Sequence, residues 1–134
     1  ATPLTKIERK HYEPWEKDIG YAQAVRSGNM LYLSGITAEG RTLDEQLTRI
    51  FDRAEKILAD FGVTTDNIVK EVIYTTNMDL LKKAIPLRKK YYPNDIYPSA
   101  SWVQVVQLFV PEFMVELELV VQLHEQKGRV SKTR

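Results

Sequence analysis

Residues 42–62 carry an apolar pattern that constrains the fold of this chain more than any other segment. Apolar side chains recur there at steps of three and four residues, the spacing of one face of an α-helix. They are Leu43, Leu47, Ile50, Phe51, Ala54, Ile57, Leu58 and Phe61. Thr42 and Glu45 have the spacing of a capping box, and Gly62 follows where a left-handed residue often ends a helix. The segment therefore predicts an amphipathic helix that needs a broad apolar surface to cover its stripe.

Strand-like segments flank this helix on both sides. Their Val, Ile, Tyr and Thr content and their turn boundaries predict strands at residues 21–26, 30–35, 68–76, 99–108 and 113–123. Ser27-Gly28-Asn29 separates the first two strands and predicts a hairpin. Strand, helix, strand order predicts a right-handed crossover between parallel strands. In the last strand, Val115, Leu117 and Leu119 alternate with Glu116 and Glu118, so the apolar set should face the helices.

The rest of the chain adds a second helix and two less regular ends. Residues 79–92 are helix-like, with Asp79 as the expected N-cap and Pro86 as the expected kink or restart. Residues 1–19 predict an N-terminal strand or arm followed by a loop, and residues 125–134 a flexible basic tail. The expected fold class is α+β, a single domain over residues 1–124 in which two helices cover one face of a mixed sheet. The uncovered face would favour oligomerisation.

Composition excludes several kinds of function. A chain of 134 residues with 43% hydrophobic and 28% charged residues is one ordinary globular domain. It has no cysteine, which excludes disulfides, thiolate catalysis and Cys-ligated metals and fits the cytoplasm. His11 and His124 lie far apart and lack the spacing of metal ligands. A net charge of +1 gives no reason to expect a nucleic acid partner, and no apolar run predicts a membrane span.

The chain resembles the Rid family, also called YjgF/YER057c/UK114. The resemblance runs from about residue 20 to residue 123. It rests on an ordered set of motifs: Gly20-Tyr21-Ala22-Gln23-Ala24-Val25, Gly28-Asn29-Met30-Leu31-Tyr32-Leu33-Ser34-Gly35, Gln46 in the long helix, Val69 to Asp79, Tyr91-Tyr92, Pro98 to Val105, and Val115-Glu116-Leu117-Glu118. It implies a chorismate-mutase-like fold, a homotrimer, and small-molecule clefts between subunits. It further implies hydrolysis of imines or enamines derived from amino acids, with release of ammonia and no cofactor.

One motif departs from the pattern of the family members that hydrolyse imines. Those members carry an arginine for the substrate carboxylate in a Pro-x-Arg-Ser motif, whereas this chain reads Pro98-Ser99-Ala100-Ser101. Alanine cannot make the two parallel charged hydrogen bonds of a guanidinium. The chain therefore resembles an Arg-less branch of the family. Arg26 or Arg88 of a neighbouring subunit is a candidate replacement, and a non-catalytic ligand-binding or protein-interaction trimer is the alternative function.

The resemblance assigns site residues at seven positions. Glu116 would be catalytic, as the group that orients or deprotonates water, while the strand pattern alone also allows it to face solvent. The substrate-binding candidates are Tyr21, Ser34, Gly35, Ala100, Ser101 and Trp102. For Trp102 the alternative is packing at a subunit interface. The basic run Lys82-Lys83 with Arg88-Lys89-Lys90 suggests the endoribonuclease activity with which many family members are labelled. No acid–base pair or metal cluster accompanies the run, so a solvated helix face is the favoured interpretation.

Overall fold

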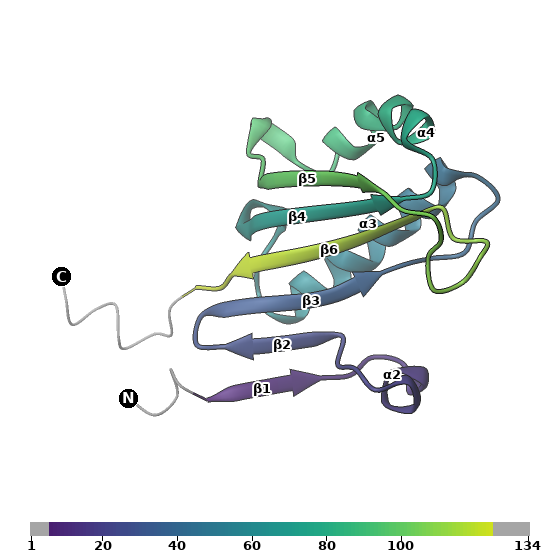
Figure 1. Ribbon diagram of the computed structural model, residues 1–134. Helices are drawn as coiled ribbons and strands as arrows, with labels where there is room; N and C mark the ends of the chain where they lie inside the picture. Colours follow the sequence, from purple (N-terminus) through teal and green to yellow (C-terminus); the bar gives the residue numbers. More distant parts are fainter. Residues whose placement is uncertain (1–5, 125–134) are drawn as a thin grey trace.

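The computed structural model describes residues 6–124 and contains a six-stranded mixed sheet (Figure 1). The strands are β1 (Ile7–Lys10), β2 (Ala24–Ser27), β3 (Met30–Ile36), β4 (Ile68–Thr75), β5 (Ser99–Gln104) and β6 (Val115–Gln122). The helices are α2 (Pro14–Ile19), α3 (Leu43–Asp60), α4 (Met78–Lys83) and α5 (Ile85–Lys89), with 3-10 turns at Thr65–Asn67 and Pro93–Asp95. The predicted α+β class is confirmed. The predicted basic tail, 125–134, lies outside the described residues.

The sheet order is β1-β2-β3-β6-β4-β5, and only β4 and β5 pair in parallel. The predicted hairpin is β2–β3, where Ser27 pairs with Met30 and Gly28 takes a left-handed φ of 64°. β3 and β4 run parallel, as their connection through α3 predicts, but β6 is inserted between them and is antiparallel to both. The last strand of the chain thus lies at the centre of the sheet.

The long helix α3 packs its apolar stripe on one face of the sheet (Figure 1). Thr42 Oγ1 accepts a hydrogen bond from Glu45 N at 3.1 Å, as a helix cap should. Glu45 itself reaches back to Arg41 N rather than to Thr42 N, so the predicted capping box is only half formed. Gly62 has a φ of 73° after the last turn, as predicted.

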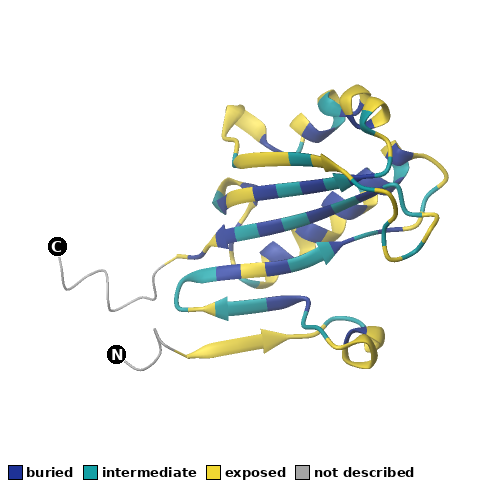
Figure 2. Cartoon of the chain, viewed as in Figure 1, coloured by how far each residue is buried: buried dark blue, intermediate teal, exposed yellow. Residues whose placement is uncertain are grey.

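Burial alternates along β6 and separates the two faces of the sheet (Figure 2). Val115, Leu117 and Leu119 are buried against the helices, as the sequence predicts. Glu116 and Glu118 are half-buried on the other face. None of the described helices is long and apolar enough to cross a membrane.

Two local predictions were wrong. Residues 14–19 form α2 instead of a loop, because Pro14 is the first helical residue and the Glu16 carboxylate accepts a hydrogen bond from Glu13 N. The spacing of Glu13 and Glu16 was the sequence signal for this cap. The N-cap of the next helix is Asn77, whose side chain accepts from Leu80 N, and Asp79 lies within the first turn. The predicted break at Pro86 is confirmed, since α4 ends at Lys83 and α5 begins just before the proline.

Candidate functional site

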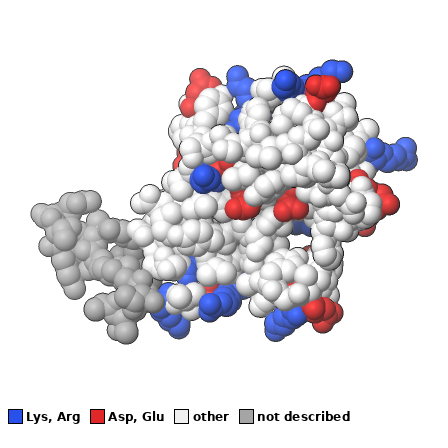
Figure 3. Space-filling view, in the orientation of Figure 1, with Lys and Arg blue, Asp and Glu red and all other residues white. Residues whose placement is uncertain are grey.

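A cavity of about 770 Å³ lies at the end of the sheet where β3 leads into α3. In the space-filling view, a hollow opens there between α2 and the loop that precedes β6 (Figure 3). Aromatic and aliphatic side chains form most of its wall, namely Trp15, Ile19, Tyr21, Phe109, Val110 and Phe113. The polar wall includes Ser34, Thr37, Arg49, Arg53 and Glu116. We call this space the α2 cavity.

Glu116 lies against Gly35 in the wall of the α2 cavity. A Cβ atom at position 35 would overlap the Glu116 carboxylate, so only glycine leaves room for the acid. Burial, and secondarily the negative charge of Glu118, raises the pKa of Glu116 above its ordinary value. A carboxyl group with a raised pKa can exchange a proton with a bound molecule closer to neutral pH.

Ser34 and Tyr21 also line the α2 cavity, and each already has a protein partner. Ser34 Oγ donates to the carbonyl of Ala22 at 2.7 Å, so its proton is occupied while its lone pairs still accept. Trp15 Nε1 donates to the Tyr21 hydroxyl at 3.1 Å. Because Tyr21 accepts this bond, its own proton is available to a ligand in the cavity.

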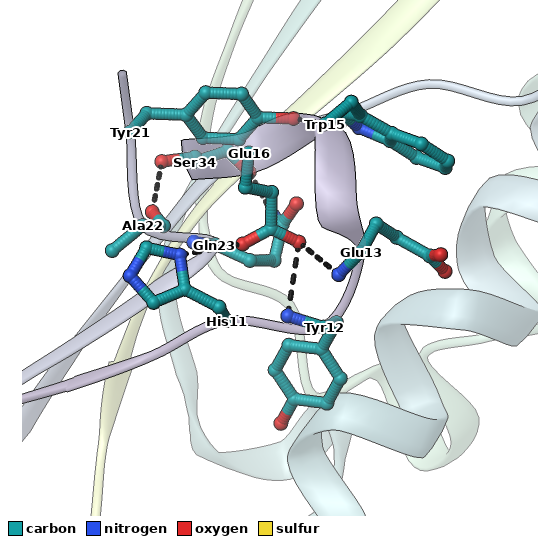
Figure 4. Close-up of polar contacts among 9 residues, drawn as sticks. All are labelled: His11, Tyr12, Glu13, Trp15, Glu16, Tyr21, Ala22, Gln23 and Ser34. Carbon is teal, nitrogen blue, oxygen red and sulfur yellow. Dashed lines mark hydrogen bonds and ion pairs between the residues drawn. The ribbon is translucent and has the colours of Figure 1, made fainter. Parts of the chain in front are cut away.

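The buried carboxylate of Glu16 fixes the position of α2, one wall of the cavity (Figure 4). It accepts hydrogen bonds from the backbone nitrogens of Tyr12 (3.0 Å), Glu13 (2.8 Å) and Gln23 (3.0 Å). His11 Nδ1 lies 3.3 Å from its Oε1. These bonds join β1, α2 and the start of β2, so Glu16 holds Trp15 and Tyr21 where they face the cavity. Glu16 was not among the predicted site residues.

The β5 candidates lie elsewhere in the protomer. Ala100, Ser101 and Trp102 do not line the α2 cavity, because β5 is the edge strand and β4 separates it from β6. Ala100 and Ser101 are exposed. Within one protomer, the seven predicted residues therefore form two groups, with Tyr21, Ser34, Gly35 and Glu116 together and the β5 residues apart.

Trp102 belongs to a buried polar cluster around Glu71. Glu71 has no exposed surface and accepts hydrogen bonds from Arg88 Nε (3.0 Å), Tyr92 Oη (2.7 Å) and Trp102 Nε1 (3.0 Å). Arg88 Nη2 also lies 2.9 Å from Glu71 Oε1, and the guanidinium stacks near the rings of Tyr92 and Trp102. The prediction of a solvated basic helix face is thus wrong for Arg88, although its lysine neighbours are exposed. Because Glu71 already binds it, Arg88 is a poor replacement for the missing arginine.

Arg49 and Arg53 are the two arginines in the cavity wall, and neither was among the predicted site residues. Both fall outside the apolar stripe of the long helix, and both are exposed. Their guanidinium groups turn toward the β3–α3 connection, where Arg49 Nη1 donates to Glu39 O and Arg53 Nη1 to Thr37 O, each at 2.7 Å. Their spacing of four residues on one helix was the available signal.

Within residues 6–124, no group of three or more His, Asp or Glu side chains is placed to hold a metal ion.

The chain is similar in sequence to known proteins over most of its length. The family described as endoribonuclease L-PSP matches residues 15–123. The chain belongs to this family. A RutC family protein of Aquifex aeolicus is 32% identical over 108 residues, which cover 75% of this chain and 86% of the relative. The resemblance to the Rid or YjgF/YER057c/UK114 family is thereby confirmed.

A solved structure and a yeast relative extend the comparison. The Mycobacterium tuberculosis member of the YjgF/YER057c/UK114 family is 25% identical, covers 88% of this chain and 100% of its own, and superposes with a TM-score of 0.81. The Saccharomyces cerevisiae protein MMF1, described as mitochondrial, is 27% identical over 127 residues, covering 90% of this chain and 83% of the relative.

Proposed function

We propose that this chain forms a homotrimer which binds a small metabolite in the α2 cavity and hydrolyses an imine or enamine C–N bond there. The observation that carries the proposal is the half-buried Glu116 carboxyl group beside Gly35, because its raised pKa suits it to acid–base work. Glu116 would take a proton from water as the oxygen attacks the imine carbon. It would then return the proton to the nitrogen, which gives a carbinolamine. Transfer of the carbinolamine hydroxyl proton to the same nitrogen, again through Glu116, would break the C–N bond and release a carbonyl compound and ammonia.

A trimer is part of the proposal because it would bring together the two groups of predicted residues. In a ring, β5 of one protomer can lie beside the α2 cavity of the next, which brings Ala100 and Ser101 to the ligand. Exposed apolar side chains are available for such contacts: Tyr32 is 47% exposed, Val103 42% and Phe109 77%. Without cysteine, the chain suits a reducing compartment, and we propose the cytoplasm.

A non-catalytic binding protein is the second candidate function, because Ala100 stands where imine-hydrolysing members have arginine. We do not extend the endoribonuclease activity in the family's description to this chain, since a net charge of +1 provides little attraction for a polyanion.

Ammonia release from freshly generated 2-imino acids tests the proposal. We expect turnover by the wild type, its loss in Glu116→Gln, and no change in Glu8→Gln, a control on the exposed strand β1. A wild type no faster than buffer would eliminate the hydrolysis of amino-acid imines and leave the binding function. Light scattering across a range of protein concentrations measures the mass and tests the trimer.

A further inference from the structure

Two arginines on α3 supply positive charge to the α2 cavity. Arg49 and Arg53 are one helical turn apart, and both line the cavity. Both also line a neighbouring cavity of about 510 Å³, which shares Trp15, Tyr21 and Gly35 with the first. The guanidinium groups thus lie where the two spaces meet.

The two arginines differ in how far their charge is already satisfied. Arg49 Nη2 lies 3.3 Å from Glu45 Oε1, so a carboxylate of its own helix already binds it. Arg53 forms no ion pair within residues 6–124, and its one hydrogen bond there is to the uncharged carbonyl of Thr37. A guanidinium has five N–H donors in a planar fork, so Arg53 keeps enough of them for a bidentate carboxylate.

The rest of the wall determines what the anion would be attached to. Trp15, Tyr21, Phe109 and Phe113 surround the space with aromatic surface. Such a wall favours a planar apolar group, which can stack on the rings and release water. Glu116 and Glu39 also line the cavity and would repel an anion that bound beside them. The favourable position for a carboxylate is therefore the α3 side, with the apolar group against the aromatic wall.

We propose that the α2 cavity selects aromatic carboxylates, and that Arg53, assisted by Arg49, is the group that binds the carboxylate in this chain. Arg53 thus does within one protomer what an arginine at position 100 does in the imine-hydrolysing members. The inference rests on the proposed function only in placing the ligand in the same cavity. It adds a ligand class and an anchor, and it replaces the expectation that Arg26 or Arg88 would provide the missing charge.

Binding of matched probes tests the inference without any turnover. The Trp102→Phe variant leaves Trp15, in the cavity wall, as the sole tryptophan, so its fluorescence reports binding. The probes are 3-phenylpropanoate, its uncharged analogue 3-phenylpropanamide, and propanoate, which keeps the charge and lacks the ring. We expect 3-phenylpropanoate to bind about tenfold more tightly than the amide, as one exposed charge-assisted pair would give. It should also bind more tightly than propanoate, because propanoate has no ring to bury against the aromatic wall.

Substitutions then assign the charge to Arg53. Arg53→Gln should abolish the preference for the carboxylate over the amide, Arg53→Lys should retain part of it, and Arg49→Gln should weaken it less. Arg9→Gln on the exposed strand β1 removes the same charge at a position that lines neither cavity, and should leave the preference intact. Circular dichroism and the melting temperature of each variant show whether it is folded. If Arg53→Gln unfolds the chain, the partial preference of Arg53→Lys carries the test.

Three results would overturn the inference. The first is equal affinity of the Trp102→Phe parent for the acid and the amide, and the second is no binding of 3-phenylpropanoate at a concentration of about 10 mM, tenfold above the usual upper limit of KM values. The third is an unchanged preference for the carboxylate in folded Arg53→Gln. The proposed hydrolysis fails separately. Arg53-dependent carboxylate binding without ammonia release supports the anchor and eliminates the deaminase. Glu116-dependent ammonia release that does not change in Arg53→Gln supports the deaminase and eliminates the anchor.

Discussion

Replacement of Glu71 by alanine should destabilise the fold more than any other single change in its buried polar cluster. The carboxylate has no exposed surface and is the acceptor for Arg88, Tyr92 and Trp102. The Arg88 side chain is 8% exposed, so water cannot readily take over when the carboxylate is removed. An uncompensated buried charge costs about 3–5 kcal/mol.

The expected loss of unfolding free energy is therefore about 4 kcal/mol. For a chain of this length, this loss corresponds to a melting temperature lower by roughly 15 °C. The double variant Glu71→Leu, Arg88→Met should lose much less, because replacing both partners leaves no buried charge without a counter-ion. Glu8→Ala should lose under about 0.5 kcal/mol, because the Lys6–Glu8 pair is exposed.

Urea unfolding of the four proteins at one protomer concentration measures these differences, because the stability of an oligomer depends on concentration. A loss below about 1 kcal/mol in Glu71→Ala would contradict the reasoning, since it would mean that Arg88 finds water or another partner. A double variant that loses as much as Glu71→Ala would contradict it as well, because it would show that the unpaired charge of Arg88 is not the source of the loss.

Three further predictions concern the cavity and the helix that supports it. Because burial raises the pKa of Glu116 in the folded state, ionisation of this group opposes folding. The stability of the wild type relative to Glu116→Gln should therefore fall as the pH rises from about 4.5, the pKa in the unfolded chain, through the pKa in the folded protein. Urea titrations from pH 4 to 7 that show a constant difference in stability would refute this. Thr42→Ala should cost about 1 kcal/mol through loss of the α3 cap, whereas Thr42→Ser should cost little; equal losses in urea would show that the hydroxyl does not cap. Ala100→Arg should not increase ammonia release, because Ala100 pairs with Glu71 in the sheet and the new guanidinium would bind that carboxylate; a gain in the same assay would show that it reaches the ligand instead.

The parts of the fold that periodicity determines were predictable from the sequence. The α3 stripe and the alternation in β6 each have one dominant period, and each led to the correct element and the correct face. Pro86 and the Gly28 turn were equally clear, because a proline or a glycine restricts the backbone locally. The order of strands was not predictable in the same way, since the insertion of β6 between β3 and β4 depends on contacts far apart in the sequence.

The candidate site was harder to predict because its residues act through neighbours that no spacing reveals. Glu16 is an acid in a short helix, and only its backbone partners from three segments mark it as buried. Arg88 looked like one more residue of a basic run, yet Glu71, 17 positions earlier, binds it. The helical period puts Arg53 outside the apolar stripe of α3, but the direction of its side chain depends on the carbonyl of Thr37.

The contact between Gly35 and Glu116 makes the two positions mutually exclusive in size. A methyl group at position 35 needs the space that the Glu116 carboxylate fills, so a variant can hold one or the other in this geometry. Gly35→Ala should therefore turn the Glu116 carboxylate out of its present position, and the protein should lose Glu116-dependent activity more than stability. Position 35 thus serves as a sequence marker: in a relative with a side chain there, an acid at position 116 must turn away from this place, be replaced by a shorter residue, or move with a displaced strand.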